Sequence, residues 1–133
     1  MTNKVVDTWW GRYTLTIDDK GFGVLDENAE VVFTRGQCHA LAIAIHQLTG
    51  WPIKGVGYKS DSPESPSHCC NYSPERKGYV DIKGLSKKPT DNFVVVNRSI
   101  SEEKAHKLKL YNMPDVETAM PFARSVLRDL EAA

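Results

Sequence analysis

The chain opens with a stretch in which apolar and polar positions alternate as they do in β-strands. In residues 10–17, Tyr13, Leu15 and Ile17 fall on one face, and this period of two is typical of a half-buried strand. The run Asp-Asp-Lys-Gly at 18–21 is a turn signal that ends the strand. The pattern therefore predicts that the N-terminal third is built from short antiparallel strands.

A second pair of strands is expected directly after this turn. Residues 22–25 and 31–34 are rich in β-branched and aromatic side chains, and the polar segment 26–28 lies between them. We predict that they form a hairpin, which makes this part of the chain a β-meander. Gly36 then permits a tight turn, after which the pattern changes from strand to helix.

The strongest helical pattern of the chain begins at about Cys38 and ends near Leu48. Leu41, Ile45 and Leu48 recur at helical spacing and predict one buried stripe, while the alanines between them let neighbouring elements approach closely. Gly50 is a candidate for the left-handed residue that ends the helix, and a proline follows it two residues later.

The remaining elements are expected to be strands at 53–58, 68–72, 78–82 and 93–97, and helices at 99–110 and 115–131. Ser99 and Glu102 have the spacing of a capping box at the start of the first of these helices. Pro121 is expected to limit or kink the second. The polar, proline-bearing segment 60–67 is predicted to be a loop and the most mobile part of the chain.

Composition is that of an ordinary globular protein, and we expect residues 1–133 to form one domain. Apolar residues make up 41% and charged residues 26% of the chain, which is enough for one core. Lys+Arg and Asp+Glu both number 17, so the chain has no net positive charge to attract nucleic acid. Nucleic acid is therefore not expected as a partner. No stretch has the length of a membrane span, and the first residues do not resemble a signal peptide. A cytoplasmic protein is therefore expected.

Cys38 is the most informative residue for function, because it falls where strand is expected to pass into helix. A thiol in the first turn of a helix meets unpaired N–H groups and the positive end of the helix dipole. Both favour the thiolate, which is the nucleophilic form. The alternative is that Cys38 is a small buried hydrophobe, the usual state of a single cysteine.

His68 and Asp81 supply the groups that could activate such a thiol. We assume a hairpin in which Tyr72 pairs with Tyr79. Because side chains alternate between the two faces of a sheet, His68 and Asp81 then share a face and lie within side-chain reach. A carboxylate beside an imidazole fixes its tautomer and stabilises the imidazolium. A shift of one residue in the register would place Asp81 on the other face, so the interpretation depends on this pairing.

The other two cysteines predict neither a disulfide nor a metal site. Three cysteines are an odd number without the spacing of a disulfide framework, and we expect Cys69 and Cys70 to be free thiols. A site that combines them with Cys38 and His68 lacks the spacing of zinc ligands, and adjacent strand residues point to opposite faces. No glycine-rich phosphate loop is present either, so no metal and no cofactor are expected.

Together these motifs resemble a family pattern. The run Gly-Gln-Cys at 36–38, the alanine-rich helix after it and its end at 46–52 are similar to small bacterial and phage proteins of the papain-like cysteine-peptidase superfamily, akin to the NlpC-like and transglutaminase-like folds. Those proteins follow the helix with a histidine-bearing strand and then an aspartate-bearing strand, here Tyr-Val-Asp-Ile-Lys-Gly at 79–84. The resemblance covers roughly residues 31–84. It implies an α+β fold in which an antiparallel sheet packs against a helix whose N-terminus carries the cysteine.

The resemblance also implies a catalytic triad of Cys38, His68 and Asp81. Papain-type enzymes carry a glutamine several residues before the cysteine, but Val32 stands six residues before it in this chain. The candidates for holding the oxyanion are therefore backbone N–H groups at the start of the helix, together with the side chain of Gln37.

His39 and Trp51 complete the candidate site as substrate-binding residues. His39 diverges from the cysteine by about 100° around the helix, so it is expected to line a pocket and not to act in the triad. His46, two turns further along the helix, is expected to be structural and hydrogen-bonded near the turn at 49–51.

The leading hypothesis is a cysteine-dependent acyl hydrolase or transferase that acts on an amide or isopeptide bond of a peptide, a protein or a small amide. The alternative is a catalytically inactive papain-like binding module, for example a phage protein that binds or sequesters a host protein or small molecule. Segment 60–67 is then a clamp on the ligand. If the protein is phage-encoded, the expected compartment is the cytoplasm of the host cell.

Overall fold

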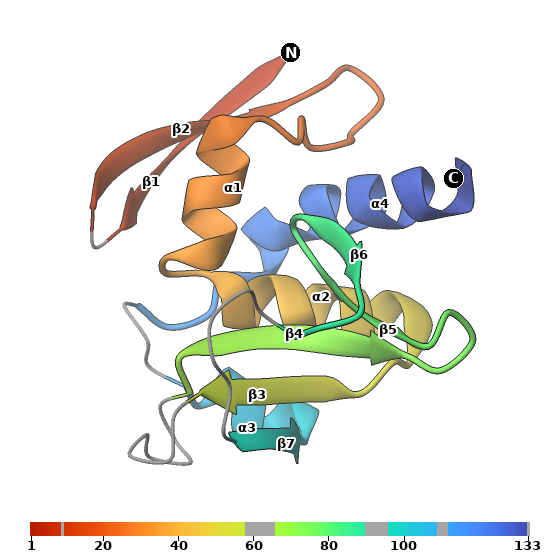
Figure 1. Cartoon of the computed structure of the whole chain (residues 1–133). Helices are drawn as coiled ribbons and strands as arrows, with labels where there is room; N and C mark the ends of the chain where they lie inside the picture. The colour runs from red at the N-terminus through yellow and green to blue at the C-terminus, as the bar shows by residue number, and fades with distance from the viewer. Residues whose placement is uncertain (9, 58–65, 90–95, 109–111, 133) are drawn as a thin grey trace.

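The structure is a computed structural model that describes residues 1–8, 10–57, 66–89, 96–108 and 112–132 (Figure 1). Its strands are β1 (Thr2–Thr8), β2 (Gly11–Ile17), β3 (Ile53–Gly57), β4 (His68–Ser73), β5 (Gly78–Asp81), β6 (Gly84–Ser86) and β7 (Val96–Ile100). Its helices are α1 (Glu27–Thr34), α2 (Cys38–Thr49), α3 (Glu102–His106) and α4 (Val116–Ala132). The fold is α+β.

Five antiparallel strands form the main sheet, in the order β6-β5-β4-β3-β7, and α2 packs against it (Figure 1). The expected strands at 68–72 and 78–82 are confirmed as β4 and β5. Of the other expectations, most of the loop at 60–67 and residues 93–95 of the last strand lie outside the described residues.

A separate antiparallel ribbon is formed by β1 and β2. The expected strand at 10–17 is confirmed, and its inward face has the predicted pattern, since Leu15 is buried while Tyr13 and Ile17 are half-buried against the core. Strand β1 was not foreseen, because most of its side chains are exposed and its sequence lacks the alternation of a half-buried strand.

The predicted hairpin of residues 22–25 and 31–34 is wrong. Residues 27–34 form helix α1, whose N-cap Asp26 accepts a hydrogen bond from the Ala29 N–H at 2.9 Å. Ala29, Val32 and Phe33 are the buried residues of this helix and recur at helical spacing. The cap and this burial outweigh the strand propensity of the β-branched residues. Residues 22–25 contribute only an isolated bridge between Gly23 and Ile17.

Helix α2 is confirmed, and it ends as expected at Gly50, which has a φ of 77° and donates its N–H to the His46 carbonyl at 2.7 Å. All residues from Cys38 to Ile45 are buried. The predicted stripe is only partly right, because Leu48 is 44% exposed. The buried stretch of α2 ends at Ile45, so the last turn of the helix lies outside the core.

Two expectations about the C-terminal helices are corrected. Helix α3 is capped by Ser101, whose side chain accepts from the Lys104 N–H, while Ser99 belongs to β7. Pro121 lies inside α4, so it does not end the helix, while a kink at this position stays a prediction. Its carbonyl accepts the N–H of Gly23 at 3.0 Å, which ties α4 to the turn after β2.

The core lies on two sides of α2. One cluster joins α2 to α1, α4 and β5, and it includes a contact between the rings of Phe33 and Phe122, with centroids 5.1 Å apart. The other joins the opposite side of α2 to β3, β4 and α3, and it contains both Cys38 and Cys69. Packing on both sides fixes the position of the α2 N-terminus against the start of β4.

Candidate functional site

The hairpin of β4 and β5 has the register that the sequence analysis assumed. Tyr72 pairs with Tyr79 and Asn71 with Val80, and the two tyrosine rings meet edge to face with centroids 5.2 Å apart. Because the pairing is not shifted, Asp81 lies on the same face as Tyr72 and His68. The hairpin therefore supplies the geometry on which the proposed His68–Asp81 pair depends.

His68 and Asp81 form a hydrogen bond of 3.0 Å between Nε2 and Oδ2. The other carboxylate oxygen of Asp81 accepts the backbone N–H of Lys83 at 2.9 Å, so the carboxylate is held at both ends. The side chains of His68 and Asp81 are only 12% and 21% exposed, which shields their interaction from solvent. Since Nε2 faces Asp81, Nδ1 is the ring nitrogen that remains for a nucleophile.

Cys38 is the first residue of α2, with Gln37 as N-cap. The N–H groups of Cys38, His39 and Ala40 have no partner within a helix that begins here. The Cys38 side chain is 2% exposed and belongs to the cluster between α2 and β4. In Figure 1 the first turn of α2 and the beginning of β4, where His68 lies, are at the same end of the sheet.

The surroundings of Cys38 favour its thiolate. Its pKa is held well below 9.0, chiefly by a hydrogen bond from the Cys69 thiol, while burial acts in the opposite direction. The neighbouring His68 and its positive charge lower the pKa further. His68 acts on Cys38 from the first position of β4, although the strand pairing places it on the face opposite to Asn71. Through His68, Cys38 is linked to Asp81.

His68 responds in the opposite sense, as expected for a thiolate–imidazolium pair. Burial is the largest influence on its pKa and acts to lower it. Hydrogen bonds and charge from Asp81 and Cys38 together exceed that effect and raise the pKa of His68 to about 10. The imidazolium is therefore the form of His68 that this site stabilises at neutral pH.

Cys69 is the member of the site that the sequence analysis missed. Asn71, two residues further along β4, donates its Nδ2 to the Ala42 carbonyl of α2 at 2.9 Å, so Cys69 shares the face that meets α2. Its hydrogen bond to Cys38 and its burial raise the pKa of Cys69, which keeps it a thiol. Strand alternation could have placed Cys69 on this face, but only the packing of α2 shows that it shares a buried cluster with Cys38.

The neighbouring Cys70 lies in a different environment. Burial and the negative charge of Asp81 raise its pKa to about 12, so it stays protonated. All three cysteines are free thiols. Cys69 and Cys70 thus point to opposite faces, as predicted, and of the two only Cys69 belongs to the buried cluster that contains Cys38.

Gln37 has a different set of contacts from the one proposed for an oxyanion ligand. Its Nε2 donates to the Met113 carbonyl at 3.3 Å, and its Oε1 accepts the N–H of Asp115 at 3.0 Å. The side chain is 5% exposed, so both ends of its amide hold the segment that leads into α4. The backbone N–H groups of α2 are left as the donors available for an oxyanion.

His39 lies beside the site but is fully buried. Its Nε2 is 3.2 Å from the Asn112 carbonyl, which fixes the proton on that nitrogen. Its Nδ1 has no hydrogen-bond partner among the described residues. His39 therefore packs the first turn of α2 against the segment before α4, and its ring is not displayed to a substrate.

Trp51 is not brought to the site. It follows the C-terminal end of α2. With a rise of about 1.5 Å per helical residue, that end lies about 16 Å from Cys38. Its side chain is 9% exposed and belongs to the core cluster on the α4 side of α2. The structure thus places Trp51 in the core.

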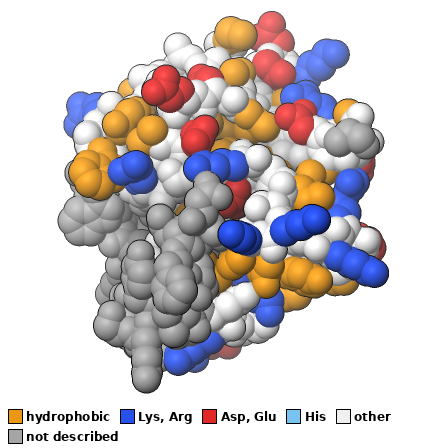
Figure 2. Space-filling view, viewed as in Figure 1, with side chains coloured by type: hydrophobic (Ala, Val, Ile, Leu, Met, Phe, Trp, Pro, Cys, Tyr) orange, Lys and Arg blue, Asp and Glu red, His pale blue; other side chains and the backbone are white. Residues whose placement is uncertain are grey.

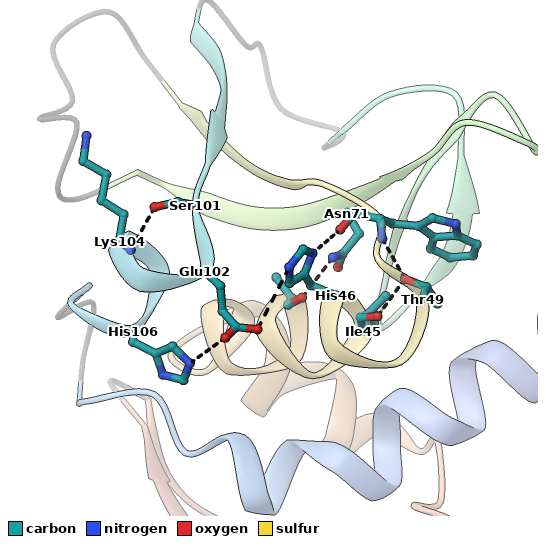
Figure 3. A network of polar contacts seen from close by, with 10 residues as sticks. Ile45, His46, Thr49, Asn71, Ser101, Glu102, Lys104 and His106 are labelled. Carbon is teal, nitrogen blue, oxygen red and sulfur yellow. Dashed lines mark hydrogen bonds and ion pairs between the residues drawn. The ribbon is translucent and has the colours of Figure 1, made fainter.

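A network of polar contacts at the other end of α2 anchors the helix (Figure 3). His46 bonds the Trp51 carbonyl through Nδ1 at 2.8 Å, as its expected structural role requires. On its other side His46 faces Glu102 of α3 at 4.0 Å, and His106 faces the second oxygen of that carboxylate at 3.9 Å. Together with the bond from Asn71 to α2, these contacts hold the helix against β4 and so fix Cys38 relative to His68.

The remaining surface adds no second chemical centre to the described part of the chain. In that part, no group of three or more His, Cys, Asp or Glu residues is arranged to hold a metal ion. On the face drawn in Figure 2, the coloured acidic and basic side chains are interspersed and are not segregated by sign. Every helix that the structure describes is too short or too polar to cross a membrane.

We compared the chain with models of known protein families, with characterised proteins and with solved structures. None of the three comparisons gives a match. The functional interpretation therefore depends on the geometry of the site.

Proposed function

We propose that the protein is a cysteine-dependent acyl hydrolase or transferase that acts on an amide or isopeptide bond. Cys38 is the nucleophile, His68 the acid and base, and Asp81 the residue that orients His68. The observation that carries this proposal is the 3.0 Å hydrogen bond between Nε2 of His68 and Asp81. It leaves Nδ1 of the same ring to interact with the sulfur of Cys38 at the start of α2. The resemblance to papain-like cysteine peptidases supports the same assignment.

The reaction begins with the thiolate of Cys38 and the imidazolium of His68. The thiolate attacks the carbonyl carbon, and the resulting oxyanion is held by N–H groups in the first turn of α2. His68 then donates its proton to the leaving amine as the C–N bond breaks, which leaves a thioester on Cys38. Water or a second amine next attacks the thioester, His68 takes its proton, and the thiolate is restored with release of the acid or the new amide.

Asp81 acts by holding the ring, not by accepting a proton. Its Oδ2 fixes the Nε2–H of His68 and directs Nδ1 away from the carboxylate. The bond from the Lys83 N–H to Oδ1 keeps the carboxylate from rotating. This chemistry uses only side chains and backbone groups of the chain, and a reducing cytoplasm suits it because the nucleophile stays a free thiol.

A chromogenic ester, p-nitrophenyl acetate, tests the proposal without knowledge of the natural substrate. We expect a burst of nitrophenolate that is stoichiometric with the protein and an acetyl group on Cys38 by peptide mass spectrometry. Cys38→Ser should lose both, and Cys70→Ser, the matched control, should keep both. His68→Ala should slow the burst by about 10²–10⁴-fold.

Cys38→Ser also separates chemistry from folding. The exchange is nearly isosteric, so the free energy of unfolding should change by less than about 1.5 kcal/mol. A folded Cys38→Ser protein with an undiminished burst would end the enzyme hypothesis.

The second candidate, a binding module on the same scaffold, is favoured by a separate cavity of about 240 Å³. Val5, Phe33 and Met113 are among the residues that line it, together with Lys4 and Asp115. Cys38 is not among the residues that line it. Under this hypothesis the protein sequesters a small ligand there, so Cys38→Ser keeps the biological effect of the protein and Met113→Lys abolishes it.

A further inference from the structure

Cys38 and Cys69 are a pair of buried thiols, whereas amide chemistry requires only one. They come from different elements, the first turn of α2 and the second residue of β4, and meet in one buried cluster. An acyl-transfer triad needs only one thiol, with an acid-base group and an orienting group beside it. The second thiol therefore calls for a role of its own.

The two sulfurs are unequal in a way that suits stepwise oxidation. Cys38 is held as the thiolate, the form that attacks electrophiles, while Cys69 keeps its proton and lies in the same buried cluster. A thiolate with a second thiol beside it is the arrangement found where a sulfenic acid is resolved to a disulfide.

Burial of Cys38 selects among electrophiles by size. Its side chain is 2% exposed, so a peptide reaches the sulfur only after a local opening of the fold. A hydroperoxide as small as hydrogen peroxide needs a much smaller opening. The resting site therefore admits this oxidant more readily than it admits an acyl substrate.

We propose that Cys38 and Cys69 form a redox-active dithiol site whose substrate is a small hydroperoxide and whose product is an intramolecular disulfide. This inference rests on the reactive Cys38 of the proposed function, but not on acyl transfer. Cys70 takes no part, because it points to the opposite face of β4 and a disulfide between adjacent residues is strained.

The reaction has two balanced steps. The Cys38 thiolate attacks one peroxide oxygen, the O–O bond breaks, and the departing hydroxide takes a proton from the imidazolium of His68 to leave as water. The sulfur of Cys69 then attacks the sulfur of the Cys38 sulfenic acid, the S–O bond breaks, and the departing hydroxide takes the proton of Cys69. Two electrons from the thiols reduce one peroxide to two waters, and a dithiol reductant restores the site.

Hydrogen peroxide and the full chain test this proposal. Reduced protein is treated with one equivalent of peroxide, free thiols are blocked with N-ethylmaleimide, and the products are mapped by mass spectrometry. We expect two of the three thiols to be lost to labelling, a peptide pair crosslinked through Cys38 and Cys69, and an intact label on Cys70. Dithiothreitol should restore all three.

Two single variants act as a matched pair, since Cys69 and Cys70 are adjacent in β4. Cys70→Ser should form the same crosslink as the wild type. Cys69→Ser should stop at the sulfenic acid, which dimedone traps on Cys38, and its circular dichroism spectrum establishes that it is folded. A wild-type protein that accumulates the dimedone adduct, or that links Cys69 to Cys70, would overturn the inference.

Reaction with iodoacetamide in the absence of oxidant separates this inference from the proposed function. Rapid alkylation of Cys38 without a peroxide-induced crosslink would overturn only the dithiol site. Absence of reaction with both reagents would overturn the proposed nucleophile as well, and with it both assignments.

Discussion

Asp81 holds the Nε2 atom of His68 at 3.0 Å across the β4–β5 hairpin, and this bond sets the chemical character of the ring. The carboxylate is fixed in turn by the backbone of Lys83. His68 is thereby restricted to one orientation, in which its Nδ1 is left for Cys38.

Replacement of Asp81 by asparagine should lower the pKa of His68 from its value of about 10, because the ring loses the hydrogen bond and the charge of a carboxylate. The amide oxygen can still accept the Lys83 N–H, so the turn should survive. NMR titration of the His68 ring measures the change, with Asp129→Asn as an exposed control. A His68 titration that is the same in Asp81→Asn and the wild type would contradict this account.

The thiolate–imidazolium pair should give the free energy of unfolding a plateau in pH. His68 has a raised pKa, so its contribution is complete below the ordinary value of 6.5 and is lost as the pH rises to about 10. Cys38 has a lowered pKa, so its contribution is complete above the ordinary value of 9.0 and is lost as the pH falls through its value in the folded protein. Below 9.0 and above the pKa of Cys38 in the folded protein, the two slopes oppose each other.

Urea denaturation over this pH range, compared with the double variant Cys38→Ser/His68→Gln, isolates the contribution of the pair. We expect the difference in unfolding free energy to be flat below pH 9.0, where the two slopes oppose each other, and to fall on both sides, toward pH 10 and toward acid. A difference that changes steadily through the middle of the range would show that the two groups are not paired.

The two ends of the expected apolar stripe on α2 should differ in their contribution to stability. Ile45 is fully buried, and Ile45→Ala should cost about 2–5 kcal/mol of unfolding free energy. Leu48 is 44% exposed, and Leu48→Ala should change the free energy of unfolding by no more than about 0.5 kcal/mol. Equal costs in chemical denaturation would mean that the last turn of α2 is packed as tightly as its centre.

Replacement of Gln37 should lower the free energy of unfolding more than it slows catalysis. Gln37→Ala leaves the Met113 carbonyl and the Asp115 N–H without their partner and should cost about 1–3 kcal/mol. The burst rate of the folded fraction should fall by much less than the about 10²–10³-fold that loss of an oxyanion donor causes. A hundredfold slower burst at unchanged stability would instead identify Gln37 as an oxyanion ligand.

Local pattern was sufficient for the elements that carry the triad. The hairpin register with Tyr72 opposite Tyr79 was assumed and is the one the structure has, and the alanine-rich run with Gly50 defined α2. Helix α1 was mistaken for a strand because its β-branched residues were given more weight than the capping position of Asp26. Its helical state depends on burial of Val32 and Phe33 against α2 and α4, which no local pattern shows.

The missed parts of the site depend on contacts between distant segments. Gln37 is held by residues more than seventy positions away, so its engagement could not be read from its place beside Cys38. Cys69 meets Cys38 only because Asn71 and the packing around it hold α2 over that face of β4. Trp51 was expected at the site, but the length of α2 places it at the far end of the helix.

The most direct test of the account is the pH dependence of Cys38 alkylation by iodoacetamide, followed on each cysteine by peptide mass spectrometry in the intact wild-type sequence. All three thiols are retained, since Cys69 itself lowers the pKa of Cys38. We predict a half-maximal rate for Cys38 at a pH well below 9.0, an upward shift of that midpoint in His68→Ala, and no comparable reaction of Cys70. A Cys38 midpoint near 9.0 that is unaffected by His68→Ala would contradict the central claim that His68 and the start of α2 hold a reactive thiolate.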